Sequence, residues 1–409
     1  MAILLLQGPM GPFFKRLMTS LQHQGTDVYK INFNGGDEWY CSGRNVYRFS
    51  GSSDQWPDFL AQFIAEHAIS SVLVYGDCRL YHRLAKGVCE QQGVNFYAFE
   101  EGYIRPNHIT FEKNGVNGYS NIAKDGLASW ENTDIEPEER IGGHLSNRIR
   151  YCSMYYNVAF FRRKHFPQYT HHRSFSPVFE ARSWLRASRR YYWYKLTEFN
   201  VQKTLVKQYS GRYFLVPLQV YNDAQIHFHS PYDSIEAFMD TLMSSFATHA
   251  DQNDILVFKH HPMDRGHTQY ADVIRKMSRR YDLKNRVIYC HDQHLPTLLD
   301  HAKGVLTINS TTALSAFYHK ASVKVLGEAF YDIAGLCSQQ SLDEFWRAPA
   351  EIDYALFLRL RNFLSHHGQV NGSYYKAIDF SVGNIVAEMT RNGALPPVIE
   401  GKAVSVNSG

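Results

Sequence analysis

Residues 254–264 of this chain read DILVFKHHPMD, and residues 304–327 read GVLTINSTTALSAFYHKASVKVLG. In both stretches a short apolar run ends in polar residues before a helical pattern begins. Ile255–Phe258 leads into KHHP, and Val305–Ile308 leads into NSTT. Such strand ends lie at the carboxyl edge of a parallel sheet, where open α/β sheets bind ligands. Ammonium, imidazole and hydroxyl groups suit an anion there, so the pattern predicts the nucleotide-binding half of a two-domain transferase.

The N-terminal part of the chain, residues 2–99, alternates short apolar strands with helical patterns, which is typical of a doubly wound α/β domain. Its predicted strands end in QGPMG, NFNGGD, YGD and FEEGYIRP. Several polar or Gly-rich strand ends in one domain favour a ligand crevice over ordinary turns. Two such domains facing each other across a cleft make the architecture called GT-B in glycosyltransferases. The predicted fold class is therefore α/β, with two Rossmann-like domains in a GT-B-like arrangement.

The length of 409 residues also favours two domains. No window of 18 apolar residues could span a membrane, and the N-terminal run AILLL fits a first strand better than a signal peptide. Six cysteines without a CxxC pair are typical of a reduced, cytosolic protein. The predicted organisation is an N-terminal acceptor and catalytic domain at 1–140, a basic aromatic helical linker at 141–210, a nucleotide-sugar domain at 211–330, C-terminal helices at 331–392 and a flexible tail at 393–409.

The linker concentrates both charge and aromatic side chains. Residues 141–210 hold 13 Lys or Arg against two Glu, together with 16 aromatic residues. Cations interleaved with aromatics suit an anionic bilayer surface. They also suit single-stranded nucleic acid, or a solvated helical linker whose aromatics are core. We favour the membrane interpretation, with Arg186, Arg189 and Arg190 beside Tyr191–Tyr194 as the membrane-facing group, and we expect no nucleic-acid partner because the rest of the chain is acidic.

Seven short motifs occur together in a specific order: QGPMGPFF, NFNGGD, GD, FEEGYIRP, PLQ, KHHP and NSTT, beginning at residues 7, 32, 76, 99, 217, 259 and 309. In this order and spacing the chain resembles the bacterial capsule polysaccharide β-Kdo transferases, a family that starts the capsule linker on a phospholipid. The resemblance covers most of residues 1–330. It implies a CMP-Kdo donor, a retaining outcome and a lipid acceptor such as phosphatidylglycerol. It also implies a cytoplasmic enzyme at the inner-membrane surface, with other capsule synthesis and export proteins as partners.

The resemblance also implies roles for particular residues. His261-Pro262 matches the His-Pro motif that CMP-sugar transferases aim at the nucleotide phosphate, and Ser310-Thr311 matches their hydroxyl pair. Glu101 falls where related Kdo transferases carry an acidic residue, often Asp, proposed as catalytic. The candidate substrate- and nucleotide-binding residues are Gln7, Gly8, Asn34, Asp77, Arg105, Gln219, Lys259, His261, Pro262, Asn309, Ser310 and Thr311.

Retention of configuration needs either two inversions, with a carboxylate nucleophile, or a same-face attack, and both routes stay open. We expect Glu100 and Glu101 on a tight turn after a strand, with Glu101 as nucleophile and Glu100 orienting it or acting on the acceptor hydroxyl. Asp37 is a reserve general base, and Arg105 suits the Kdo carboxylate. His261 would compensate the charge of the leaving phosphate. The alternatives are that the glutamates cap a segment or pair with Arg105, that His261 is a core histidine, and that Ser310 and Thr311 form an ordinary helix N-cap.

Several other functions are disfavoured by pattern. There is no Asp-x-Asp motif, and the adjacent His pairs lack a third ligand at useful spacing, so no metal is expected. Neither GxGxxG nor GxxxxGK[ST] occurs, so no NAD, ATP or other cofactor is expected beyond the CMP-Kdo donor. The alternative from another class is a non-catalytic, glycosyltransferase-like scaffold in capsule assembly and export.

Overall fold

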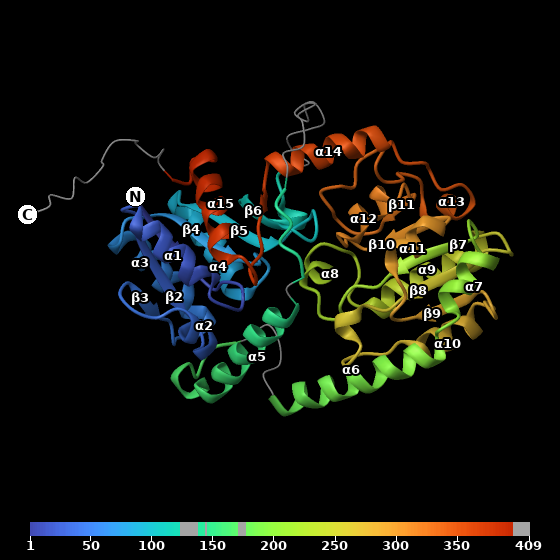
Figure 1. Ribbon diagram of the computed structural model, residues 1–409, viewed down its shortest axis with the longest axis horizontal. Helices are drawn as coiled ribbons and strands as arrows, with labels where there is room; N and C mark the ends of the chain where they lie inside the picture. The colour runs from blue at the N-terminus through green and yellow to red at the C-terminus, as the bar shows by residue number, and fades with distance from the viewer. Residues whose placement is uncertain (123–137, 144, 171–176, 396–409) are drawn as a thin grey trace, which may run out of the picture. The chain divides into compact units, whose positions relative to one another are not determined.

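The protein is described here by a computed structural model that covers residues 1–122, 138–143, 145–170 and 177–395 (Figure 1). The chain forms two compact units. The first draws its described residues from Met1–Val116, Glu136–Phe175 and Gly368–Gly409, and the second from Asn117–Ile135 and Ser176–His367. None of the described helices is long and apolar enough to cross a membrane.

The first unit is built on a seven-stranded sheet of order β12-β6-β5-β4-β1-β2-β3. The strands are β1 (Ala2–Leu5), β2 (Asp27–Asn32), β3 (Val46–Arg48), β4 (Ile69–Tyr75), β5 (Asn95–Glu101), β6 (His108–Lys113) and β12 (Gln369–Asn371). β1 to β5 run parallel, whereas β6 is antiparallel to β5 and β12 is antiparallel to β6. β1 and residues 72–74 of β4, in the middle of the sheet, are apolar and buried, as expected where helices cover both faces.

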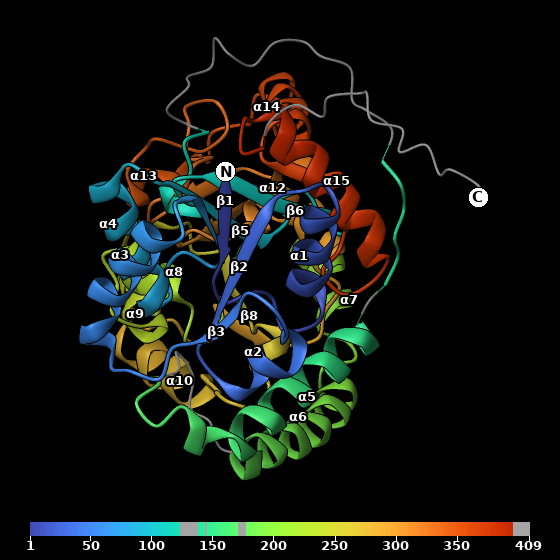
Figure 2. The same ribbon diagram turned by 90° about the vertical axis from the view of Figure 1, so that its left-hand side faces the viewer.

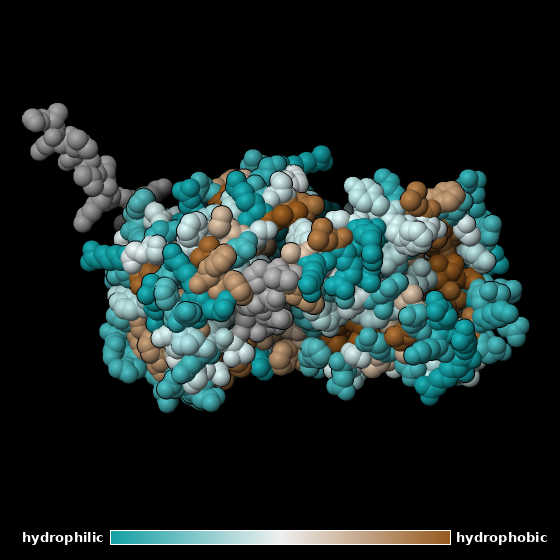
Figure 3. Space-filling model, turned by 90° about the horizontal axis from the view of Figure 1, so that it is seen from below, coloured by the Kyte–Doolittle hydropathy of each residue, from teal (hydrophilic) through white to brown (hydrophobic). Residues whose placement is uncertain are grey.

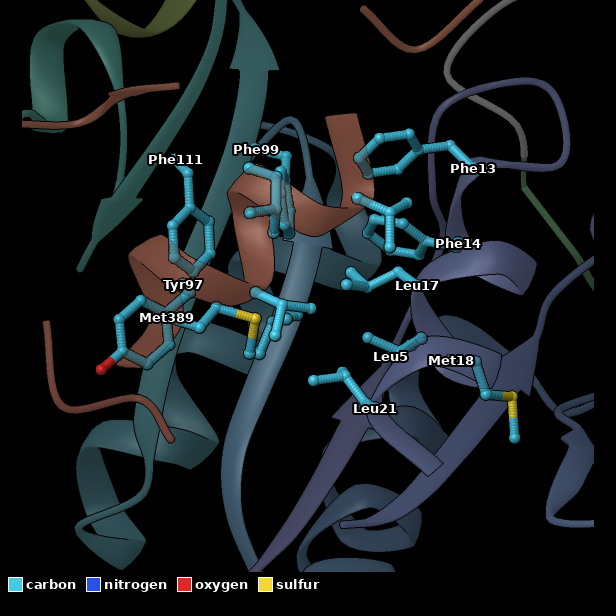
Figure 4. Packing of buried hydrophobic residues seen from close by; sticks show 14 of the residues in the cluster. Leu5, Phe13, Phe14, Leu17, Met18, Leu21, Tyr97, Phe99, Phe111 and Met389 are labelled. Atoms are coloured by element: carbon cyan, nitrogen blue, oxygen red, sulfur yellow. The ribbon is translucent and has the colours of Figure 1, made fainter. Parts of the chain in front are cut away.

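Helices α1 (Phe13–His23) and α15 (Ile378–Arg391) cover one face of this sheet, and α3 (Trp56–Glu66) and α4 (Leu80–Gln92) cover the other (Figure 2). In α1 the residues Phe13, Phe14, Leu17, Met18 and Leu21 recur at helical spacing and are buried. They meet side chains of β5, β6 and α15 in one apolar cluster (Figure 4). The unit is completed by α2 (Gly35–Tyr40) and α5 (Leu145–Phe161), which contact each other.

Replacing Met389 in α15 tests whether the C-terminal helix holds the first unit together. Met389 is fully buried in the cluster with Tyr97 and Phe111. Met389→Ala is expected to lower the free energy of unfolding by about 2–5 kcal/mol, because the cavity forms in a packed core. Met154→Ala, at an exposed position on α5, should change it by less than about 0.5 kcal/mol. Urea unfolding followed by fluorescence measures both, and equal midpoints for the two variants would contradict this packing.

The second unit is built on a five-stranded parallel sheet of order β11-β10-β7-β8-β9. Its strands are β7 (Tyr213–Pro217), β8 (Ile255–Lys259), β9 (Val287–Cys290), β10 (Gly304–Thr307) and β11 (Val323–Val325). Its helices are α6 (Pro177–Thr197), α7 (Val201–Gln208), α8 (Ala224–Phe228), α9 (Ile235–His249), α10 (Ala271–Arg280), α11 (Leu295–His301), α12 (Thr312–Tyr318), α13 (Leu342–Arg347) and α14 (Tyr354–His366). The predicted fold class of two α/β domains with Rossmann-like parallel sheets is confirmed, and their arrangement across a cleft stays a prediction.

The domain boundaries differ from the prediction in three places. The segment 141–210 is helical but is divided between the units, since α5 belongs to the first and α6 and α7 to the second. The predicted C-terminal helices also separate, because α15 returns to the first unit and packs on α1. In the predicted tail, Ala394 and Leu395 are buried in that unit's core, whereas residues 396–409 lie outside the described residues.

Candidate functional site

Each sheet has a topological switch point, where successive strands begin to add on the opposite side of the first strand. In the first unit it lies between β1 and β4, and in the second unit it lies between β7 and β10. Ligands of open α/β sheets bind in the crevice outside the carboxyl ends of such strands. Gln7 and Asp77 follow β1 and β4, and Gln219 and Asn309 follow β7 and β10. Four residues predicted from strand ends therefore lie at the two switch points.

At the switch point of the second unit, Gln219 and Asn309 are joined directly. Gln219 Nε2 donates to Asn309 Oδ1 at 3.0 Å, and Asn309 N donates to Gln219 Oε1 at 3.3 Å. Asn309 Nδ2 donates to the carbonyls of Gln225 and His229. These contacts fix the loops that follow β7 and β10 in one position, so the two residues shape the crevice.

Ser310 and Thr311 differ in what their hydroxyl groups do. Ser310 Oγ accepts from Thr312 N at 3.2 Å and lies 3.0 Å from Thr312 Oγ1, so it holds the first turn of α12. Thr311 is the N-cap residue, but its side chain makes no cap hydrogen bond. The ordinary-cap interpretation therefore describes Ser310, and the half-buried Thr311 hydroxyl is the better candidate for ligand contact.

Lys259, the last residue of β8, is a largely buried lysine. It is 7% exposed, and burial lowers the pKa of its side chain, whereas the nearby Cys290 and Asp292 side chains oppose that shift. Among the described residues, none forms a hydrogen bond or an ion pair with Lys259 Nζ. An ammonium group on a largely buried side chain, without a partner among the described residues, is suited to an incoming anion.

The two histidines after Lys259 have different environments. His260 is buried, its Nδ1 lies 2.7 Å from Tyr289 Oη, and burial together with His291 lowers its pKa to about 3. His261 is partly exposed and accepts from Met263 N through Nδ1 at 3.2 Å. Pro262 begins the short 3-10 helix Pro262–Asp264 that follows. The core-histidine interpretation therefore fits His260, whereas His261 is only partly buried.

At the switch point of the first unit, a buried polar network joins Gln7, Asn34 and Asp37. Gln7 Nε2 donates to Asp37 Oδ2 at 3.1 Å and to Tyr155 Oη at 2.9 Å, and Tyr155 Oη donates to Asp37 Oδ1 at 2.9 Å. Asn34 Nδ2 donates to Tyr155 Oη at 2.7 Å. Asp37 also accepts from Phe33 N, so its carboxylate is occupied by structural contacts.

Arg79 stands beside this network at the start of α4. Its Nη1 donates to Gln7 Oε1 at 2.9 Å, and its guanidinium lies 5.1 Å from the centroid of the Tyr75 ring. A cavity of about 60 Å³ adjoins it, lined by Gln7, Arg79, Leu80, Tyr81, His82, Tyr169 and Thr170. Arg79 was not predicted, although its place two residues after Asp77 at a strand end is a local signal that could have marked it.

Glu100 titrates near neutrality. Its pKa is raised to about 7, mainly by burial and in part by the nearby Glu101 and Asp77 carboxylates, whereas a hydrogen bond from Glu101 N at 3.0 Å and the Arg79 charge oppose the rise. A carboxyl group with a pKa near 7 is suited to general acid–base chemistry.

Glu101 has a different partner. Its Oε1 lies 3.6 Å from Arg148 Nη1 of α5. The predicted tight turn is wrong, because Glu100 and Glu101 are the last residues of β5 and pair with Thr110 and Ile109 of antiparallel β6. The two carboxylates therefore have different charged neighbours: Arg79 and Asp77 act on Glu100, and Arg148 lies beside Glu101.

The remaining predicted residues have structural contacts. Arg105 is exposed and its Nε donates to Gly102 O at 3.1 Å, so neither glutamate pairs with it. Asp77 Oδ2 accepts from Val116 N at 2.8 Å. A Cβ atom at Gly8 would lie 2.7 Å from the Phe14 ring, so glycine is required there by packing.

A pocket of about 540 Å³ lies away from these residues, at the amino end of the second sheet. Its charged lining includes Arg212, Asp254 and Lys303, and Lys303 Nζ lies 2.6 Å from Asp254 Oδ2. Because charges of both signs pair within it, this pocket has no evident ligand chemistry.

The family model described as "Capsule polysaccharide biosynthesis protein" matches residues 70–375. The chain belongs to this family. It is 41% identical to the capsule polysaccharide export protein KpsS of Escherichia coli over 374 residues, which cover 91% of this chain and 96% of that protein. It is 37% identical to the capsule polysaccharide modification protein LipB of Neisseria meningitidis over 387 residues, covering 92% of each. The predicted relationship to capsule polysaccharide proteins is confirmed.

A more distant likeness is found among solved structures. The β-Kdo 2,7-transferase KpsC of Thermosulfurimonas dismutans matches with a TM-score of 0.45 and 14% identity, over 94% of this chain and 99% of that one. A likeness this distant says nothing about the chemistry of this chain, so donor and acceptor stay predictions.

Proposed function

We propose that this member of the capsule polysaccharide family is a retaining glycosyltransferase that moves Kdo from CMP-Kdo to a phosphatidylglycerol-type lipid at the inner-membrane surface. The observation that carries the proposal is the carboxylate pair at the end of β5, in which Glu100 has a pKa of about 7 and Glu101 lies beside Arg148. Two carboxylates in unlike surroundings suit a reaction that needs both a nucleophile and an acid–base group.

The roles divide between the units. In the second unit, Lys259 and His261 would compensate the phosphate charge of the nucleotide, with Thr311 as a further donor. In the first unit, the Glu101 carboxylate would attack C2 of Kdo as the bond from C2 to the phosphate oxygen breaks and CMP leaves with the electron pair. The acceptor hydroxyl would then give its proton to Glu100 and attack C2, which releases Glu101. Arg79 and Arg148 suit the Kdo carboxylate better than the exposed Arg105 does.

A transfer assay tests the proposal. Purified protein with CMP-Kdo and a fluorescent phosphatidylglycerol is expected to give a Kdo-lipid product, whereas His261→Ala should give at least tenfold less. His23→Ala, at an exposed position, is the control. Absence of product in wild type would contradict the proposal; retained CMP binding would then point to another acceptor.

Lys259→Met separates a ligand-binding role from a structural one. Loss of the ammonium is expected to weaken CMP binding by roughly 10- to 100-fold, because a charge-assisted hydrogen bond to phosphate is removed. The melting temperature should stay equal or rise, since a charge whose pKa is already lowered by burial is also removed. Calorimetric titration with CMP and thermal unfolding measure the two effects, with the exposed Lys284→Met as control. A large fall in melting temperature with unchanged CMP affinity would contradict this assignment.

The name of one relative favours a second candidate. KpsS of Escherichia coli is called an export protein, which suits a scaffold that assembles the capsule export machinery without catalysis. That role predicts that substitutions of Glu101 and Lys259 spare capsule production, and the proposed transferase predicts that they abolish it.

A further inference from the structure

The helix α6 carries polar side chains on its buried side. Arg190 Nη1 donates to the carbonyls of Arg265 and Thr268 at 2.7 and 2.9 Å, and the Tyr194 ring stacks on His291 with centroids 3.5 Å apart. Just beyond the helix, Glu198 Oε1 lies 2.6 Å from His291 Nδ1. These contacts anchor one side of α6 to the second unit. Arg190 and Tyr194 are therefore not membrane-facing, which corrects part of the predicted group.

The outer side of α6 is apolar instead. Leu185, Tyr192 and Leu196 follow at intervals of seven and four residues, so they share one helix face. They are 73%, 66% and 73% exposed, and nearby Trp193 and Phe199 are 63% and 74% exposed. A surface helix normally turns its polar face to water, so a large apolar face there indicates an interaction surface.

The charge around this face is almost entirely positive. Residues 182–207 contain seven Lys or Arg and one acid, Glu198. Arg182, Arg189 and Lys195 are exposed on α6, and Lys203 and Lys207 are exposed on α7. Glu198 is 12% exposed and bound to His291, so it does little to reduce the surface charge. Figure 3 looks onto the side where Figure 1 places α6, and brown apolar groups lie there among teal polar ones.

We infer that this outer face of α6 docks the protein on an anionic lipid bilayer. Leucine and aromatic side chains enter the boundary between headgroups and acyl chains, and flanking lysines and arginines attract anionic headgroups. Bases of a single-stranded nucleic acid would stack on the aromatic rings, but such binding does not account for the exposed Leu185 and Leu196. The inference deepens the proposed function, since the proposed acceptor lies in a bilayer, but it can be measured without donor or turnover.

Sedimentation with vesicles tests this surface. The full-length protein is expected to bind vesicles of phosphatidylglycerol and phosphatidylcholine but not of phosphatidylcholine alone. The double variant L185S/L196S should bind at least tenfold more weakly, and each of Arg189→Gln and Lys195→Gln about fivefold more weakly. Both leucines are exposed, so folding should be unchanged. Leu358→Ser, on α14, is the matched control because Leu358 is also exposed.

Three results would overturn the inference. The first is vesicle binding by L185S/L196S that equals wild type, and the second is wild-type binding to neutral vesicles that equals its binding to anionic ones. The third is a wild-type dimer in light scattering that L185S/L196S does not form, which would assign the face to a second copy of the chain. A separate transfer assay tests the proposed function. L185S/L196S should transfer Kdo to a short-chain soluble lipid as well as wild type does. If wild type transfers nothing but its vesicle binding still depends on α6, the surface stands and the transferase proposal fails.

Discussion

Glu101→Gln is expected to reduce kcat for Kdo transfer by about 10⁴-fold or more, because loss of a nucleophile removes the covalent route. The amide keeps the size of the side chain but cannot attack C2. Folding should be nearly unchanged, since the Arg148 contact is partly exposed, at 3.6 Å, and such pairs contribute about 0–1 kcal/mol.

The measurement is initial rates of product formation at saturating CMP-Kdo, with thermal unfolding in parallel. Glu90→Gln is a matched control, because Glu90 is exposed on α4 in the same unit. A rate within tenfold of wild type for Glu101→Gln would exclude the nucleophile role, and Arg148 would then be pairing with a structural carboxylate.

Glu100→Gln is expected to reduce kcat by about 10²- to 10⁴-fold, the usual range for a general acid or base. Because the pKa of Glu100 is about 7, wild-type kcat should rise with pH and level off above that value as the base form accumulates. The variant should lose this limb of the pH profile. A limb that persists unchanged in Glu100→Gln would show that another group is the base.

Glu100 should also make the free energy of unfolding depend on pH. A carboxyl whose pKa is raised on folding binds more protons in the folded state than in the unfolded state between its ordinary pKa of 4.5 and about 7. The stability it contributes is therefore lost as pH rises through that window. Between pH 4.5 and pH 8 the free energy of unfolding should therefore fall more for wild type than for Glu100→Gln. Urea unfolding of both proteins at the two pH values measures this difference.

Local patterns in the sequence were enough to predict several of the strand ends. Lys259, Asn309 and Gln7 each follow a short apolar run and precede a helical pattern, and that order is visible within ten residues. The strand order, which the sequence does not show, brings Gln219 next to Asn309 and Arg79 next to Gln7.

Contacts between distant segments could not be predicted in this way. Arg148 is one of 13 cations in residues 141–210, and nothing local marks it as the partner of Glu101. Tyr155 reaches Asp37 across 118 positions of sequence. The amphipathic pattern of α15 indicates a buried face but not which sheet covers it. A tight turn was predicted at Glu100 and Glu101, but β5 continues to Glu101 because β6 pairs with it.

The anomeric configuration of the lipid product tests the central claim most directly. Wild-type protein, CMP-Kdo and a phosphatidylglycerol acceptor are incubated together, and the purified lipid is examined by NMR spectroscopy. The account predicts one Kdo linked to the lipid in the same anomeric configuration that it has in CMP-Kdo. A product of inverted configuration would contradict the role of Glu101, and a lipid without Kdo would contradict the proposed transferase.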